Sequence, residues 1–244
     1  MQRAAAVLMA PFLAALLGAA EPVTLDTDPH LMARWKFDEV EGTKALDSSP
    51  HGRHAELKGG LSFAKNSVAG RAGKALSVGG GGTIEAAGYK GVAGAAARTV
   101  AAWIKTTRPE GEIVAWGRND FGAMWTFQFI RGRVGVTPKG GYFYMNSATH
   151  DGEWHHVAIV LAAAETPNLH DHAALYKDGA PAEIHDIGLL DMFPIATGSE
   201  IDVRIGARFE GALDDVRIYD RALAAEEIKA LFELRSDTPL SPGK

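Results

Sequence analysis

Residues 209–223 read Phe209-Glu210-Gly211-Ala212-Leu213-Asp214-Asp215-Val216-Arg217-Ile218-Tyr219-Asp220-Arg221-Ala222-Leu223. The two-residue period of a β-strand places Asp214, Val216 and Ile218 on one face. We expect this face to point inward, because Val216 and Ile218 are β-branched and apolar. A carboxylate at Asp214 then needs hydrogen bonds, a cation or a metal ion as its partner.

Composition is that of an ordinary globular protein. The chain has 244 residues, of which 46% are hydrophobic and 23% are charged, and its formal net charge is -5. No basic block stands out, so we expect no nucleic-acid partner. There is no cysteine, so disulfides cannot contribute to stability.

The first twenty residues have the layout of a secretory signal peptide. Arg3 precedes an apolar run from Ala4 to Leu17, and small residues up to Ala20 follow. An uncleaved membrane anchor is the alternative, but the run is short for a bilayer span and contains Pro11. We therefore expect cleavage after Ala20, no membrane span afterwards, and a location in the medium, the periplasm or the cell envelope.

Strand signals dominate the rest of the chain. Short apolar runs recur about every ten residues with turn formers between them, which is typical of a β-sandwich or jelly roll. One helix is expected at 224–234, where Ile228, Leu231 and Phe232 follow helical spacing. The predicted organisation is an extended leader at 21–30, one domain at 31–235 and a polar tail at 236–244.

The segment at 209–223 resembles the closing motif of laminin-G-like, concanavalin A-like jelly-roll modules, in which Gly-x-hydrophobic-Asp-Asp/Glu-Val-Arg-Ile-Tyr precedes Arg-Ala-Leu. The resemblance covers roughly residues 31–235 and implies an all-β fold of two antiparallel sheets with one short C-terminal helix. Four further stretches carry it, in the same order: Ala33-Arg34-Trp35-Lys36-Phe37-Asp38-Glu39, Gly73-Lys74-Ala75-Leu76-Ser77-Val78, Val100-Ala101-Ala102-Trp103-Ile104-Lys105-Thr106 and Gly152-Glu153-Trp154-His155-His156-Val157-Ala158.

The resemblance also implies a structural Ca²⁺ between the first turn and the last strand. Asp38 and Asp214 are the positions that match, and carboxylates with backbone carbonyls are the ligands that Ca²⁺ prefers. Relatives often carry an Asp where Gly79 stands here, so this chain lacks one acid of the pattern. The alternative is that backbone N–H groups or an arginine satisfy Asp214, while Asp38 shapes a turn.

Both binding modules and hydrolases use this fold. A retaining glycoside hydrolase needs two carboxylates about 5 Å apart. Glu200 and Asp202 begin a pattern of that kind, but Arg204 stands where the second glutamate is required. We therefore expect a secreted, non-catalytic recognition or adhesion module that binds a glycan or a surface protein. A glycan-cleaving hydrolase or lyase, and a structural envelope protein, are the alternatives.

A binding face is expected to expose aromatic rings, because sugar rings stack on them. The candidates lie around the loop 118–122, and Trp125 and Tyr142 are the two that we consider as surface contacts. The alternative is that these rings fill the core between the sheets.

Overall fold

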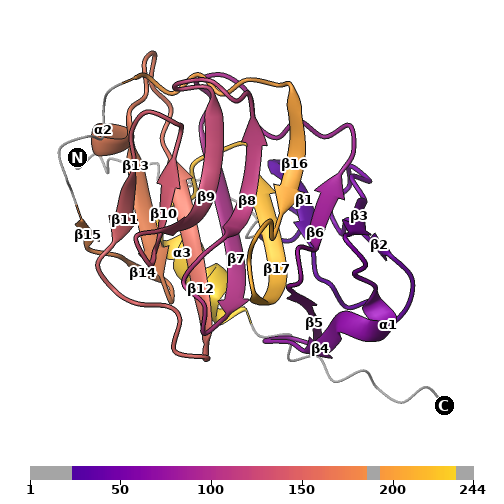
Figure 1. Ribbon diagram of the computed structural model, residues 1–244. Helices are drawn as coiled ribbons and strands as arrows, with labels where there is room; N and C mark the ends of the chain where they lie inside the picture. Colours follow the sequence, from indigo (N-terminus) through magenta and orange to yellow (C-terminus); the bar gives the residue numbers. More distant parts are fainter. Residues whose placement is uncertain (1–23, 186–192, 235–244) are drawn as a thin grey trace, which may run out of the picture.

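The computed structural model describes residues 24–185 and 193–234. The predicted all-β sandwich is confirmed, since the described residues form two antiparallel sheets of eight and nine strands (Figure 1). Sheet A has the order β14 (Ala180–Pro181), β13 (Ala173–Lys177), β12 (Trp154–Leu161), β7 (Arg98–Lys105), β17 (Gly211–Tyr219), β5 (Lys74–Val78) and β4 (Ser67–Ala69), and β1 (Leu31–Trp35) also pairs with β17.

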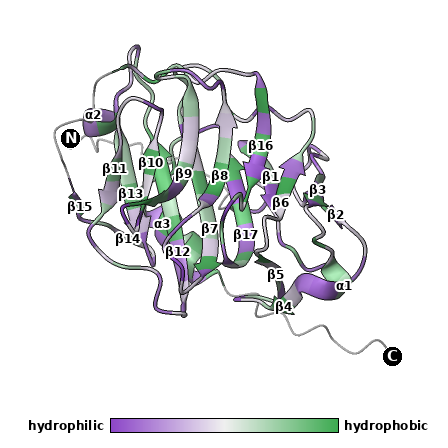
Figure 2. Cartoon of the chain, in the orientation of Figure 1, coloured by the Kyte–Doolittle hydropathy of each residue, from purple (hydrophilic) through white to green (hydrophobic). Residues whose placement is uncertain are grey.

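Sheet B packs against sheet A and supplies the other half of the core. Green and purple residues alternate along β16 in Figure 2, as expected for a strand with one face in the core. The order of sheet B is β15 (Ile184–His185), β11 (Phe143–Met145), β10 (Arg133–Thr137), β9 (Met124–Ile130), β8 (Glu112–Gly117), β16 (Ile201–Ile205), β6 (Thr83–Ala86), β3 (Ala55–Lys58) and β2 (Lys44–Ala45).

Large aromatic side chains fill the space between the two sheets. Trp35, Trp116, Trp125, Phe127 and Phe143 are all fully buried in this core. A large aromatic residue contributes more buried apolar area than any other side chain, so these five account for much of the hydrophobic stabilisation.

The closing strand β17 contains a β-bulge that the two-residue period did not predict. Its register against β7 shifts between Asp214 and Arg217, and Asp215 has φ +45°. Leu213 therefore points into the same core as Val216 and Ile218, as its core contacts show. The expected inward position of Asp214 is wrong, because the bulge reverses the alternation and turns Asp214 to the outer face of sheet A.

Buried charges fix the strand beyond the bulge. Asp215 accepts hydrogen bonds from Arg34 on β1 at 2.6 Å and from Arg217 on its own strand at 2.9 Å. Burial alone would raise the pKa of Asp215, but Arg217 and Arg34 lower it to about 2. Asp26 binds the same two arginines at 2.9 and 2.7 Å. The segment 24–30 consists of turns rather than the extended leader expected there, and the network binds it to the domain.

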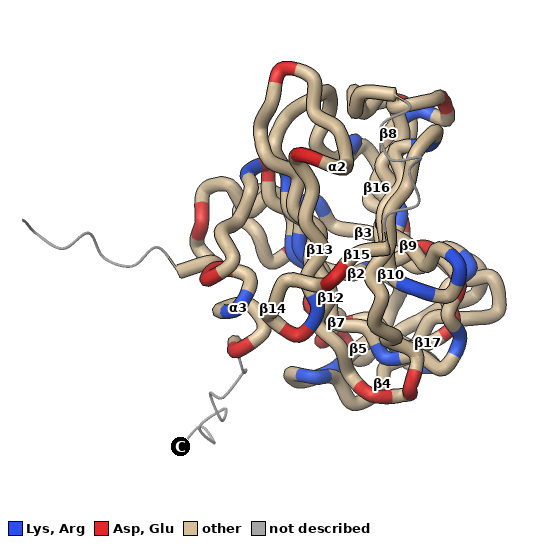
Figure 3. Tube along the Cα trace, turned by 90° about the vertical axis from the view of Figure 1, so that its left-hand side faces the viewer, with Lys and Arg blue, Asp and Glu red and all other residues tan. Residues whose placement is uncertain are grey.

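Helix α3 (Ala225–Glu233) agrees with the prediction to within one residue at each end and covers the outer face of sheet A. Ile228 and Leu231 pack on that face, and Figure 3 shows the helix outside the layer of β12, β13 and β14. Phe232 stacks on Trp103 with 5.5 Å between ring centroids, and His156 lies 5.3 Å from the same Trp103 ring. No described helix covers the outer side of β8, β9 and β10 in that view.

Two short helices occur in addition to the one that the sequence predicts. They are α1 (Phe63–Asn66) and α2 (Leu169–His172), each of four residues. The predicted signal peptide and polar tail lie outside the described residues. Within the described ranges, no helix has the length and apolar character needed to cross a bilayer.

His156 makes the fold sensitive to acid. Burial lowers the pKa of His156 from 6.5 to about 4, and its Nδ1 has no hydrogen-bond partner. The unfolded chain therefore takes up a proton between pH 6.5 and pH 4 that the folded chain excludes, and stability falls as the pH falls through this window. The difference between the two pKa values of His156 lowers the free energy of unfolding by about 3 kcal/mol at pH 4 relative to pH 7.

We expect His156→Leu to remove this loss of stability at low pH. Leucine is similar in size to histidine but cannot be protonated. Urea unfolding of both proteins from pH 7 to pH 4 tests it. The free energies of unfolding should diverge in favour of the variant as the pH falls, and parallel curves would contradict the assignment to His156.

Candidate functional site

The outer face of sheet B carries a groove of about 520 Å³. Two rows of cross-strand neighbours lie on this face of the sheet and supply part of the lining of the groove. Four strands at their usual spacing span about 14 Å, which is wide enough for an extended ligand. The first row is Arg204, Ala115, Thr126 and Thr137, and the second is Glu112, Gln128, Gly135 and Tyr144.

Small residues keep the middle of this face low. Ala115 and Gly135 contribute almost no side chain, while the longer side chains of Met124, Gln128 and Arg204 line the groove. Gly135 cannot be enlarged without movement, because a Cβ there would lie 2.7 Å from the Cβ of Tyr144. The result is a hollow with hydrogen-bonding groups along its sides.

One carboxylate lies in the groove, and two arginines surround it. Glu112 accepts hydrogen bonds from Arg204 Nε at 2.9 Å and Nη2 at 2.6 Å, and Arg208 Nη2 lies 3.6 Å from its other oxygen. A bulge between Glu112 and Val114 turns the acid outward while Ile113 and Val114 both enter the core. Glu112 N–H also donates to the Ala207 carbonyl at 2.8 Å, which holds the turn bearing Arg208 against the groove.

The rim of the groove carries an exposed aromatic ring. The Phe121 side chain is 57% exposed and stacks on Phe193 with 4.9 Å between ring centroids. A Cβ on Gly140, which lines the groove, would lie 2.7 Å from the Phe121 ring, so the two residues are in direct contact. Lys139 Nζ lies 5.6 Å from the same ring and donates to the Asn119 carbonyl oxygen at 3.0 Å.

This arrangement suits hydroxyl-rich ligands. The amide, hydroxyl and guanidinium groups of Gln128, Thr126 and Arg204 offer donors and acceptors along the floor. The exposed face of Phe121 offers an apolar surface on which a ring can stack. Glu112 is the single acid among the described lining residues, whereas hydrolysis of a glycosidic bond by the usual mechanism requires two.

The acids that suggested an enzyme are not paired with a second carboxylate. Glu200 lies 3.5 Å from Arg118 and is exposed. Asp202 binds Lys90 at 2.7 Å and accepts a hydrogen bond from the Gly88 N–H. Each of the two has a basic partner, so their sequence pattern reflects local charge pairing.

Asp38 and Asp214 converge on one short turn at the outer face of sheet A. Asp214 Oδ2 accepts hydrogen bonds from the Arg71 and Ala72 N–H groups at 2.8 and 3.2 Å. Asp38 Oδ1 accepts one from the Lys74 N–H at 2.8 Å. Both line a cavity of about 320 Å³ on this face. The predicted pair is thus brought together, although backbone N–H groups also satisfy part of each carboxylate.

The electrostatics of this pair favour a cation. Burial raises the pKa of Asp214 to about 7, and the negative charges of Asp215 and Asp38 act in the same direction. Two carboxylates on one cavity are oxygen donors of the kind that Ca²⁺ prefers, but Arg34, Lys36 and Arg217 line the same cavity. Within residues 24–185 and 193–234, no group of three or more His, Cys, Asp or Glu side chains is arranged to hold a metal.

The aromatic residues chosen from the sequence differ from those that the structure exposes. Trp125 is fully buried, so the expectation of a surface contact there is wrong. Tyr142 is partly exposed and stacks on Tyr144 at 6.3 Å between ring centroids. Phe121 was not selected, although its place in the polar loop 118–122 was a signal for exposure.

Several solved structures share the fold. Domain 4 of AbnA, a GH43 extracellular arabinanase from Geobacillus stearothermophilus, in complex with arabinotriose, has a TM-score of 0.60 at 17% identity, with 82% of this chain and 97% of that chain covered. The botulinum neurotoxin serotype G binding domain has a TM-score of 0.53 at 14% identity, with 83% of this chain and 50% of that chain covered. The receptor binding domain of botulinum neurotoxin D has a TM-score of 0.51 at 14% identity, with 84% of this chain and 52% of that chain covered.

At these identities the likeness shows the fold alone, and the chain spans about half the length of the two neurotoxin structures. No curated protein matches the chain in sequence at a significant level. The laminin-G-like family described as the concanavalin A-like lectin/glucanases superfamily matches residues 78–229, which is more than half of the chain. The chain therefore belongs to the concanavalin A-like lectin/glucanases superfamily.

Proposed function

We propose that this protein is a non-catalytic module that binds a glycan in the groove on the outer face of sheet B. The observation that carries the proposal is the exposed Phe121 ring at the rim of a groove lined by hydrogen-bonding side chains. A sugar ring stacks its apolar C–H face on Phe121 while its hydroxyls bond to groups such as Gln128 and Thr126. The arabinotriose complex of the arabinanase domain supports a sugar ligand for a domain of this fold.

The single carboxylate in the groove supports a binding role rather than hydrolysis. Glu112 is bound to Arg204 through two hydrogen bonds, and it is the single acid among the described residues that line the groove, whereas glycoside hydrolysis by the usual mechanism uses two carboxylates. A carbohydrate ligand that binds without turnover is the expected result.

We also propose that the protein acts outside the cytoplasm, in the medium, the periplasm or the envelope. The basic start and apolar run of residues 3–20 support export. N-terminal sequencing of the exported protein should find Glu21 as the first residue. An exported chain that begins at Met1 would contradict cleavage.

The binding proposal is tested by a glycan array on the purified protein, followed by titration with the sugars that bind. Phe121→Ala should weaken binding about tenfold, because a sugar ring stacked on an aromatic side chain contributes on the order of 1 kcal/mol beyond the area that it buries. Val40→Ala is the matched control, since Val40 is another apolar side chain that is 62% exposed but does not line the groove.

Three results would contradict this proposal. They are the absence of any bound glycan, equal affinities for Phe121→Ala and the unaltered protein, and release of a cleaved sugar. Equal melting temperatures for the two variants would show that the change in affinity does not arise from unfolding.

We further propose that Asp38 and Asp214 hold a Ca²⁺ ion that stabilises the domain. Chelator should lower the melting temperature by about 5–10 °C relative to calcium at 100 times its Kd. Asp214→Ala and Asp38→Asn should each abolish this response, whereas Asp120→Ala, which removes an exposed acid elsewhere, should leave it intact. Calorimetry in calcium and in chelator measures the two melting temperatures. Equal melting temperatures of the unaltered protein in the two conditions would contradict a bound Ca²⁺ ion.

A further inference from the structure

The groove on sheet B is basic although the protein as a whole is acidic. The formal net charge of the chain is -5, yet the lining residues include Lys139, Arg204 and Arg208 against the single acid Glu112. The local charge of the lining is therefore positive. Blue Lys and Arg segments are visible on the outer side of β9 and β10 in Figure 3.

Two of these three cations have no acid within hydrogen-bonding distance. Lys139 Nζ donates to the carbonyl and the side-chain oxygen of Asn119, at 3.0 and 2.9 Å, and both of these acceptors are neutral. The Arg208 side chain is 79% exposed and approaches Glu112 only to 3.6 Å. Arg204 alone pairs with Glu112 through hydrogen bonds. The one negative charge of Glu112 is thus shared by two arginines, and Lys139 binds neutral oxygens, so the lining keeps a net positive charge that a ligand can neutralise.

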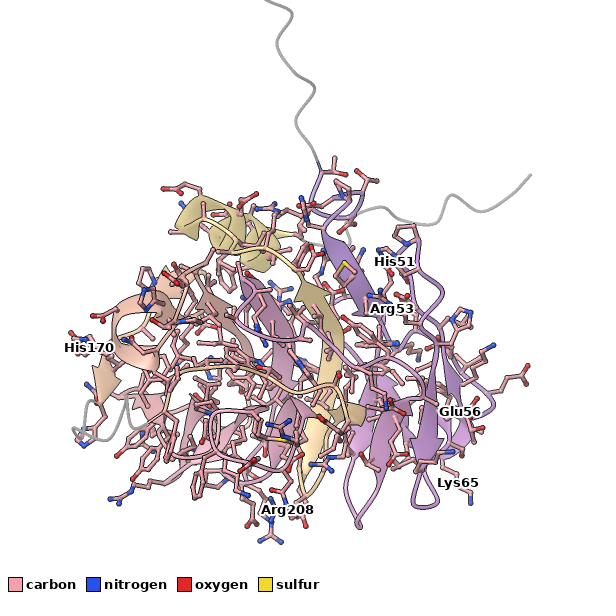
Figure 4. All side chains as sticks on the ribbon, turned by 90° about the horizontal axis from the view of Figure 1, so that it is seen from above. His51, Arg53, Glu56, Lys65, His170 and Arg208 are labelled. Atoms are coloured by element: carbon pink, nitrogen blue, oxygen red, sulfur yellow. The ribbon has the colours of Figure 1, made fainter. Side chains whose placement is uncertain are left out.

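The backbone holds Arg208 in this position. The residue has φ +59°, in the left-handed region, and its turn follows β16. Gly111 makes the close approach of this turn possible, because a Cβ on Gly111 would collide with the Arg208 backbone. Figure 4 shows Arg208 projecting from the side of the molecule opposite α3, which appears in yellow.

Lys139 and Arg208 lie toward different ends of the groove. Lys139 is bound to Asn119, two residues after the last residue of β8, Gly117. Arg208 is close to Glu112, at the first residue of the same strand. Six residues of a strand span about 17 Å. A ligand that reaches both cations must therefore be an oligomer that carries more than one negative group.

We infer that the ligand of the groove is an anionic oligosaccharide, with carboxylate or sulfate groups that bind Lys139 and Arg208. This inference rests on the proposed glycan binding. Arginine and lysine both form charge-assisted hydrogen bonds with such oxygens, and these bonds are about twice as strong as neutral ones. Phe121, beside Lys139, stacks the sugar ring whose charged group the lysine binds.

The test uses two pairs of probes, each consisting of a charged polysaccharide and its neutral counterpart with the same backbone. Polygalacturonate is compared with its fully methyl-esterified form, and dextran sulfate is compared with dextran. Titration calorimetry at 50 and 500 mM NaCl should show binding of at least one charged member, little binding of its neutral counterpart, and weaker binding at high salt. The first pair reports carboxylate recognition and the second reports sulfate recognition.

Lys139→Gln and Arg208→Gln should each weaken binding of the charged probe about tenfold, because each removes one charge-assisted contact. Lys65→Gln is the matched control, since Lys65 is an exposed lysine on α1 that does not line the groove. It removes the same unit of charge and should leave the affinity within about twofold.

Each outcome separates this inference from the proposed function. Equal binding of charged and neutral probes, with loss in Phe121→Ala, would overturn the anionic ligand and leave glycan binding intact. Charged binding that falls equally in all three glutamine variants, or in none, would also overturn the assignment to Lys139 and Arg208. Failure to bind either these probes or any sugar on a glycan array would overturn both.

Discussion

The β-bulge at Asp214 and Asp215 is the constraint on which the rest of the structure depends. It lets Leu213, Val216 and Ile218 of one strand all enter the core between the sheets. It also turns two adjacent acids to the outer face of sheet A. Asp215 with its left-handed backbone is stabilised by the partly buried Arg34 and the buried Arg217. Loss of either partner would leave a buried charge unpaired, which is far more costly than loss of an exposed ion pair.

The bulge also separates two roles of neighbouring acids. Asp215 binds β1 and the segment 24–30 to the closing strand through arginines, so its charge is compensated within the protein. Asp214 faces the turn that carries Arg71 and Ala72 and has only N–H donors there. The two carboxyls consequently have pKa values of about 2 and about 7, although they are adjacent in the sequence.

The sequence was sufficient to predict the sandwich and most of its central strands. Strands such as β8, β10 and β12 were predictable because each is a well-marked apolar run between turns. The short edge strands β2, β14 and β15 have two residues each and leave no periodic signal. The face of Asp214 was predicted wrongly because the prediction assumed an unbroken two-residue period, which a bulge interrupts.

The groove was harder to predict for a related reason. Its two rows join residues from β8, β9, β10, β11 and β16, and only the register between strands shows that Arg204, Ala115 and Thr126 are neighbours. A second bulge, at Glu112, reverses the alternation in β8 and turns that acid outward. Aromatic rings could not be sorted by residue type either: Trp125 is in the core, whereas Phe121 is exposed because its loop leaves the sheet.

The two outer faces of the sandwich differ in what covers them, and this difference supports the division of roles. On sheet A, α3 packs through Ile228 and Leu231, and the acids beside it are engaged by arginines and backbone N–H groups. The charged groups on that face therefore stabilise the fold by pairing with one another and with the backbone. On sheet B no described helix covers the central strands, and Lys139, Arg204 and Arg208 face the single carboxylate of Glu112 in the groove. The net positive lining beside an exposed Phe121 is an arrangement that an anionic sugar would satisfy, because its charged groups bind the cations while its ring stacks on the phenyl face.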